Sequence, residues 1–208
     1  VLKYLGLKKN LEIHYDGDLP ARSGIGSSSA FTVGLLNSLY RYIGIKASKI
    51  RLAKESIKIE QNIIKETVGS QDQIGVTYGG LNHIKFQTVG NFLVKPLNIS
   101  NNRIKSLEKK LMLFHTGIFR NAEFVTKSYV KNFKNKVSYL QNINSLTNEA
   151  INILKTGKLD DFGKLLNETW LMKKGISNNI SNKVINEIYD QALSNGAIGG
   201  KLLGAGGG

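Results

Sequence analysis

Residues 20–30, PARSGIGSSSA, place a glycine-rich turn in front of three consecutive serines and the start of an amphipathic segment. Gly24 and Gly26 permit backbone angles and a close approach to a ligand that larger side chains would block. The free N–H groups at the start of a helix favour an anion, and serine hydroxyls add donors and Mg²⁺ ligands. The stretch therefore predicts either a phosphate cradle or a plain helix N-terminus after a tight turn. It is not a Walker A motif, because no Gly-Lys-Ser/Thr ends it.

Two carboxylates follow in a pattern that suits metal-dependent transfer chemistry. Glu60 falls near the end of a predicted helix, and Asp72 sits in the predicted turn GSQDQ, residues 69–73. With a serine hydroxyl nearby, two such carboxylates are able to hold Mg²⁺ and orient a hydroxyl nucleophile. Taken singly, Glu60 also fits an exposed helical carboxylate, and Asp72 a turn-forming side chain. The tail at residues 199–208, GGKLLGAGGG, fits a loop lying against a ligand or a flexible chain end.

The order of elements around these motifs is mixed α+β. Helical spacing of apolar residues predicts one helix over 28–43 and a second after a Ser48 cap. Their predicted apolar stripes are Phe31, Leu35, Leu36, Leu39, Ile43 and Ile50, Ala53, Ile57, Ile64. Residues 66–80 are predicted to be loop. Strands are predicted at 11–15, 83–86, 92–97, 110–117 and the start of the tail, and later helices after 98–102 and near 121–139, 144–155, 158–174 and 181–195.

Composition excludes several functional classes. The chain has no cysteine, which excludes disulfides, thiolate catalysis and zinc–thiolate sites. It has no run of about 18 apolar residues, so no membrane-spanning helix is expected, and its opening does not resemble a signal peptide. The net charge of +14 comes from 29 basic against 15 acidic residues, with the lysines scattered. Solvated faces explain most of this charge, and attraction of phosphate ligands or nucleic acid stays open. We expect a cytoplasmic protein.

Taken in order, the three motifs resemble those of the GHMP kinases, a family named for galactokinase, homoserine kinase, mevalonate kinase and phosphomevalonate kinase. PARSGIGSSSA is similar to the family's second motif, Pro-x3-Gly-Leu-Gly-Ser-Ser-Ala, with Ile25 in place of Leu. GSQDQ is similar to its Gly-x-x-Asp-Gln/Asn segment, and GGKLLGAGGG to its third motif. The resemblance implies an α+β GHMP kinase fold in two incomplete domains. Residues 1–98 would form a part like a ribosomal protein domain, and residues 99–208 a ferredoxin-like part.

The resemblance also implies ATP and Mg²⁺ as cofactors and a role for each matched residue. Asp72 would be the catalytic carboxylate beside the acceptor hydroxyl, either removing its proton or orienting it. Ser28 and Glu60 would bind Mg²⁺, and Gly204 would also contact the substrate. The triphosphate would lie against Gly24, Ile25, Gly26, Ser27, Ser28, Ser29, Gly204, Gly206 and Gly207.

Longer stretches, among them KIEQNIIKETVGSQDQ and LMLFHTGIFRNA, are similar to the family's D-glycero-D-manno-heptose 7-phosphate kinases. The implied reaction phosphorylates the anomeric hydroxyl of that sugar to give the 1,7-bisphosphate, in polysaccharide biosynthesis. A phosphosugar needs a cationic contact, and Arg22 and Arg120 are the expected ones. As partners we expect this small phosphosugar, no nucleic acid and no membrane, with a homodimer left open.

Three alternatives remain on the sequence alone. They are the same chemistry on a fucose- or galactose-like sugar, a non-catalytic homologue, and a nucleic-acid-binding module. The family's first motif is absent, and the third stops at Gly208. These departures imply a fragment of a longer protein, which need not be active by itself.

Overall fold

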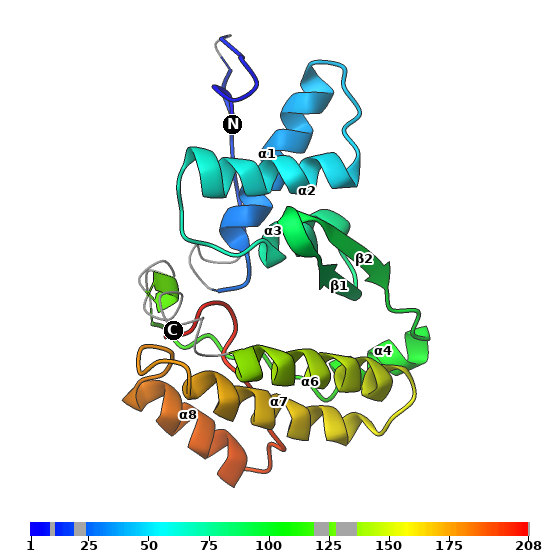
Figure 1. Cartoon of the computed structure of the whole chain (residues 1–208), viewed down its shortest axis with the longest axis vertical. Coiled ribbons are helices and arrows are strands. Elements are labelled where there is room, and N and C mark those ends of the chain that lie inside the picture. Colours follow the sequence, from blue (N-terminus) through cyan, green and yellow to red (C-terminus); the bar gives the residue numbers. More distant parts are fainter. Residues whose placement is uncertain (9–10, 19–23, 119–124, 128–136, 208) are drawn as a thin grey trace. The chain divides into compact units, whose positions relative to one another are not determined.

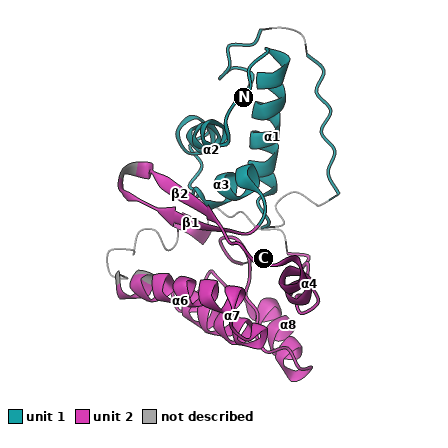
Figure 2. Ribbon diagram, turned by 90° about the vertical axis from the view of Figure 1, so that its right-hand side faces the viewer, with its two compact units in different colours: residues 1–80 teal, residues 81–208 magenta. Residues whose placement is uncertain are grey.

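The structure is a computed structural model that describes residues 1–8, 11–18, 24–118, 125–127 and 137–207 (Figure 1). The chain divides into two compact units, Val1–Gly80 and Leu81–Gly208 (Figure 2). Helices and a two-stranded sheet make up the described part, which confirms the predicted mixed α+β class. The predicted domain boundary after residue 98 stays a prediction. No described helix combines the length and apolar content that crossing a membrane requires.

The first unit is built from helices that pack on one another. Its elements are α1 (Ser27–Tyr42), α2 (Lys49–Lys58), the π-helical turn η1 (Ile59–Ile63) and α3 (Gln71–Tyr78). The helices α1, α2 and α3 contact one another in pairs. Ser48 caps α2 as predicted, because its Oγ accepts a hydrogen bond from the Arg51 N–H at 3.3 Å. Among the described residues of this unit, Leu36, Tyr40, Leu52 and Ile59 form a core cluster.

The buried face of α1 differs from the predicted apolar stripe. Leu36 and Leu39 are buried as predicted, but Phe31 and Ile43 are each 39% exposed. Ser29 is buried instead, although it is polar. Because α1 contacts both α2 and α3, the face it buries includes positions that hydrophobicity alone does not select.

The second predicted helix continues through η1, where the hydrogen-bond pattern widens. The Ile64 N–H donates to the Ile59 carbonyl oxygen at 2.8 Å, five residues back. Ala53 is buried as predicted, whereas Ile50 and Ile64 are exposed. The π-helical turn places Glu60 on the buried face, and such turns often occur at functional sites.

The second unit begins with an antiparallel hairpin. Strand β1 (Asn82–Phe86) pairs with β2 (Phe92–Pro96), with Ile84 opposite Val94, and the 3₁₀ turn η2 (Thr88–Gly90) joins them. Both strands confirm predicted ones. The helices that follow are α4 (Asn101–Glu108), α6 (Val137–Lys155), α7 (Leu159–Lys174) and α8 (Lys183–Ser194). Among the described residues of this unit, one core cluster contains Val125, Trp170, Ile180 and Ile185, and another contains Leu146, Ile153 and Leu165.

Several predicted elements are wrong. Residues 11–15, 110–117 and 197–203 form no strand, because a strand needs a hydrogen-bonded neighbour and only β1 and β2 pair in the described part of the chain. Residues 111–114 are exposed, not buried. The loop predicted over 66–80 contains α3, whose first turn carries Asp72, a favourable place for a carboxylate. The helix predicted at 121–139 lies mostly outside the described residues.

Candidate functional site

The glycine-serine turn enters α1 without a side-chain cap. Residues 19–23 lie outside the described residues, so the description starts at Gly24. Gly24 has φ 76° and Gly26, the N-cap of α1, has φ 80°. Glycine is favoured at both positions because side chains disfavour this left-handed region. No side chain among the described residues caps the helix, so the first-turn N–H groups are available to a ligand.

Asp72 lies against this turn. A methyl group placed on Gly26 would be 3.4 Å from Asp72 Cβ and 3.6 Å from its Cγ. Residue 72 as a whole is exposed, yet partial removal of water from its carboxyl raises the pKa above the ordinary value. The structure thus brings together the predicted anion-binding turn and the predicted catalytic carboxylate.

Glu60 lies at the centre of a buried polar cluster with Ser29 and Gln73. The exposed fractions of the three residues are 2%, 4% and 1%. Ser29 Oγ donates to Glu60 Oε2 at 3.1 Å, and Gln73 Nε2 donates to the same oxygen. Neither Glu60 Oε1 nor Gln73 Oε1 has a partner among the described residues. We call these three residues the Glu60 cluster.

The loop between Glu60 and Asp72 is held by Gln61. Its Nε2 donates to the Val68 carbonyl oxygen at 2.9 Å and to Ser70 Oγ at 3.2 Å. The Glu66 N–H also donates to the Glu60 carbonyl oxygen at 2.9 Å. These bonds fix the start of α3, and therefore Asp72, relative to the π-helical turn.

The predicted magnesium ligands differ in position. Ser28 is exposed, whereas its neighbour Ser29 contacts Glu60. No group of three or more His, Cys, Asp or Glu among the described residues could hold a metal ion. A Mg²⁺ site would therefore rest on Glu60, serine hydroxyls and phosphate oxygens of the nucleotide. The buried, unpartnered Glu60 Oε1 fits such a cation, because a carboxylate oxygen is a ligand that Mg²⁺ prefers.

Sequence reasoning missed two features of the site. It gave Gln73 no role, although GSQDQ contains it, and it expected Ser29 to face phosphate rather than Glu60. The sequence analysis had no signal for Gln73, because it predicted residues 66–80 to be loop. On the observed helix α3, Gln73 follows Asp72 directly, so the two side chains point to different neighbours.

The glycine tail is part of the second unit and packs against the start of α8. Gly206 has φ 112°, and a methyl group there would lie 3.0 Å from the Ile180 carbonyl oxygen. The Gly207 N–H donates to that oxygen at 2.7 Å. Lys173 Nζ donates to the carbonyl oxygen of Gly204 at 2.6 Å. Close packing therefore accounts for glycine at 206, and contact of Gly204, Gly206 and Gly207 with a nucleotide stays a prediction.

Lys173 is a further unusual group of this region. Burial and the neighbouring charge of Lys201 lower the pKa of Lys173 to about 8. Its ammonium also donates to the Leu202 carbonyl oxygen at 3.3 Å. The predicted phosphosugar contacts Arg22 and Arg120 both lie outside the described residues.

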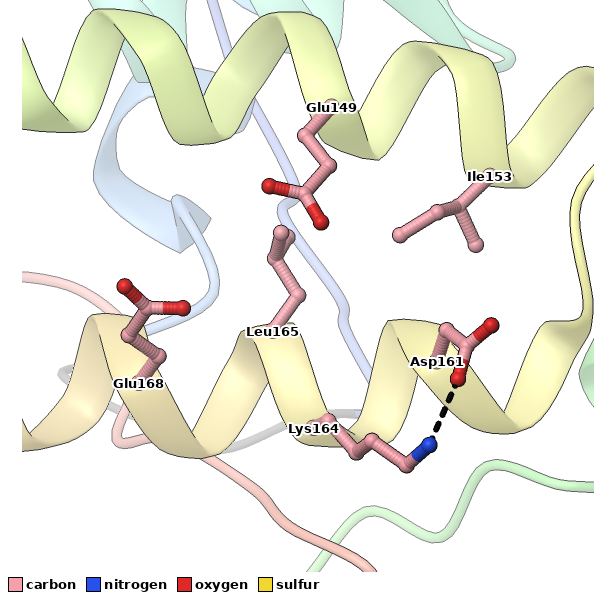
Figure 3. Close-up of a pocket in the computed structure, with 6 residues that line it drawn as sticks. All are labelled: Glu149, Ile153, Asp161, Lys164, Leu165 and Glu168. Carbon is pink, nitrogen blue, oxygen red and sulfur yellow. Dashed lines mark hydrogen bonds and ion pairs between the residues drawn. The ribbon is translucent and has the colours of Figure 1, made fainter.

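A hollow of about 200 Å³ between α6 and α7 is a separate feature (Figure 3). The residues that line it are Glu149, Ile153, Asp161, Lys164, Leu165 and Glu168. Lys164 Nζ forms an ion pair with Asp161 Oδ1 at 2.7 Å. The carboxylates of Glu149 and Glu168 therefore give the lining of the hollow a net negative charge. Because negative charge repels a triphosphate, this hollow does not fit ATP.

Comparison with known proteins extends over both units. The pattern of the GHMP kinases N terminal domain matches residues 1–80, and that of the GHMP kinases C terminal domain matches residues 149–208. A D-glycero-alpha-D-manno-heptose 7-phosphate kinase from Campylobacter jejuni is 31% identical over 202 residues, covering 96% of this chain and 59% of the relative. An L-fucokinase/L-fucose-1-P guanylyltransferase from Bacteroides fragilis is 26% identical, covering 95% of this chain and 21% of the relative.

A solved structure agrees with these matches. The D-glycero-D-manno-heptose 1-phosphate kinase from Bacteroides thetaiotaomicron has a TM-score of 0.70 at 24% identity, covering 91% of this chain and 53% of that one. That likeness shows the fold. The chain spans between half and two thirds of the heptose kinases it matches. Both family patterns, in order along the sequence, establish that this chain belongs to the GHMP kinase family.

Proposed function

We propose that the protein is an ATP-dependent sugar kinase that acts on D-glycero-D-manno-heptose 7-phosphate. It transfers the γ-phosphate to the anomeric hydroxyl and forms the 1,7-bisphosphate and ADP. The observation that carries the proposal is the contact of Gly26 with Asp72, which puts a helix start suited to phosphate beside a carboxylate suited to a hydroxyl. The similarity to a heptose 7-phosphate kinase supports the choice of sugar.

In the proposed reaction the anomeric oxygen attacks the γ-phosphorus and forms an O–P bond. The bond from that phosphorus to the β,γ-bridging oxygen breaks, and ADP leaves with its electron pair. Asp72 accepts a hydrogen bond from the hydroxyl and either takes its proton or orients it. Partial removal of water from the Asp72 carboxyl raises its pKa above the ordinary value, which makes the carboxylate a stronger base. The first-turn amides of α1 hold the phosphates.

The remaining contacts are proposals of the same kind. Bound Mg²⁺ would neutralise charge on the phosphate oxygens, and Glu60 and Ser28 are its proposed ligands. Arg22 and Arg120 are proposed to hold the sugar phosphate, and Gly204 to approach the substrate. A cytoplasmic location and a homodimer stay predictions.

An acceptor panel tests the reaction in the complete encoded protein, with ADP release as the measurement. The panel contains D-glycero-D-manno-heptose 7-phosphate, fucose, galactose and mevalonate. We expect the heptose phosphate to give the highest kcat/KM, and Asp72→Asn to lower kcat about 100-fold or more, the usual contribution of a positioned acid or base. Faster turnover of fucose or galactose would refute the choice of sugar. Equal rates for wild type and Asp72→Asn would refute the role of Asp72.

Two glycine variants test the contact that carries the proposal. Gly26→Ala places a side chain at φ 80° beside Asp72, so we expect about 1–2 kcal/mol of backbone strain. We also expect a fall in kcat/KM of about 100-fold from displaced reacting groups. Gly34→Ala is the matched control, because it lies in the same helix with nothing within 4 Å of the added methyl. Wild-type kcat/KM in Gly26→Ala would remove the supporting observation.

A further inference from the structure

The Glu60 cluster has more acceptors than donors. Glu60 Oε2 receives two hydrogen bonds, one from Ser29 Oγ and one from Gln73 Nε2. The Gln73 amide must face Glu60 with its nitrogen, because the opposite orientation would bring two acceptors together. Glu60 therefore has one oxygen held by two neutral donors and one oxygen held by none of the described residues.

The two unpartnered atoms belong to neighbouring side chains. Glu60 Oε1 and Gln73 Oε1 are both buried acceptors with no described partner. Glu60 also forms no ion pair with any Lys, Arg or His of the described residues. A buried acceptor without a donor destabilises the folded state, and more so when it is charged. The two unpartnered oxygens of the Glu60 cluster therefore suit a cation or a hydrogen-bond donor that is supplied by a ligand.

Resting on the proposed function, we propose that Gln73 is a positioning residue for the cation of the nucleotide complex. With Ser29, it holds Glu60 Oε2 and so fixes the rotation of the carboxylate, and Oε1 would be the oxygen left to bind the cation. Gln73 Oε1 would be a second acceptor beside it. Because Gln73 is the neighbour of Asp72 on α3, the same short helix sets both the cation ligand and the carboxylate at the acceptor hydroxyl.

The test measures the contribution of the cation to nucleotide binding. Calorimetry on the complete encoded protein gives Kd for a non-hydrolysable ATP analogue, first without metal and then with saturating Mn²⁺. The Kd without metal divided by the Kd with Mn²⁺ gives the contribution of the cation to nucleotide binding. Gln73→Met keeps the length of the side chain and removes its hydrogen bonds. We expect it to lower the ratio about tenfold, as loss of a partner that orients a metal ligand does, and to leave the metal-free Kd unchanged.

Gln71→Met is the matched control, since Gln71 is an exposed glutamine on the same turn of α3. We expect its ratio to stay within about twofold of wild type, because it removes no bond to a metal ligand. Ser29→Ala removes the second donor to Glu60 and should also lower the ratio. It decides the question if Gln73→Met does not fold.

A role of Gln73 in folding alone would change both Kd values of Gln73→Met equally, and this result would overturn the proposal. So would a wild-type ratio in both Gln73→Met and Ser29→Ala. In a Glu60→Gln background, Gln73→Met should have no further effect on the ratio, because its target carboxylate is gone. If wild type shows the metal-dependent ratio but phosphorylates no acceptor, the proposed function fails while the role of Gln73 stands.

Discussion

Glu60 in the first unit and Arg103 in the second are both charged side chains within protein, but their neighbours differ. The Arg103 guanidinium donates to the carbonyl oxygens of Leu154 and Ile153 at 2.6 Å each, and to that of Gly157. These carbonyls lie in the last turn of α6 and just beyond it, where the helix ends and its last carbonyl oxygens need partners from outside the helix. Glu60 is hydrogen-bonded on one oxygen only, as far as the described residues reach.

Under the proposed function, this difference separates a structural charge from one that binds a cation. Arg103 uses three of its N–H donors to complete a helix end, and none of its side-chain atoms is buried without a partner. Glu60 keeps a buried acceptor ready, and stability gains nothing from that oxygen. The presence of a charge does not distinguish the two cases, but a buried atom without a hydrogen-bond partner does, because Glu60 has one and Arg103 has none.

The largest effect is expected from Glu60→Gln. The amide has the same shape but carries no charge for the cation, so kcat/KM of the complete encoded protein should fall about 100-fold or more. The free energy of unfolding should rise by about 1 kcal/mol, because an unpaired buried charge is removed. Kinetics with urea unfolding check both results. A large loss of stability in this variant would break the comparison, since Glu60 would then act like Arg103.

The opposite pattern is expected from Arg103→Met. Loss of three charged hydrogen bonds at the end of α6 should lower the free energy of unfolding by about 2–4 kcal/mol. We expect kcat/KM well below the unfolding temperature to stay within about twofold, since Arg103 takes no part in the proposed site. Thermal unfolding and kinetics give the two values, and Lys105→Met on the same helix is the exposed control. A wild-type Tm in Arg103→Met would contradict the structural role.

A smaller, pH-dependent effect is expected from Lys173, which has carbonyl partners but also a like charge beside it. Its pKa is about 8 in the folded state, against an ordinary value of 10.5, which applies to the lysine side chain in the unfolded chain. Between these values the unfolded chain holds the proton that the folded one has released, so stability rises with pH. We expect wild type to gain about 1–2 kcal/mol relative to Lys173→Met between pH 8 and 10.

Urea unfolding at several pH values measures this difference. Lys155→Met serves as control, because Lys155 is exposed. A constant difference between wild type and Lys173→Met across this range would show that Lys173 is held without a lowered pKa. The comparison of charged side chains would then depend only on Glu60→Gln and Arg103→Met.

Helical parts of the fold could be predicted from the sequence because their hydrogen bonds are local. The helices and the hairpin β1–β2 therefore follow from spacing and turn residues. The strands predicted at 11–15 and 110–117 were wrong, because an apolar pattern does not show whether a strand has a hydrogen-bonded neighbour, and that neighbour can be distant in sequence. The helix α3 was missed because glycine and glutamine lie between its few apolar residues, so that no helical spacing of apolar residues is apparent. Ile74 in this helix is fully buried.

The site could be predicted in part for a similar reason. Residue chemistry singled out the glycine turn, Glu60 and Asp72, and the structure places Gly26 against Asp72. The bonds within the Glu60 cluster depend on the rotation of α1 against its neighbours, which the predicted apolar stripe had wrong. Polar side chains on a buried face do not appear in a hydrophobic pattern.

The exposed run at residues 111–114 has a chemical consequence. Met112 is 80% exposed, and its neighbours Leu113 and Phe114 are 72% and 61% exposed. The thioether of Met112 should therefore be oxidised by dilute peroxide well before that of Met172, which is partly buried. Mass spectrometry of the sulfoxide would then report whether another part of the protein shields this run in solution.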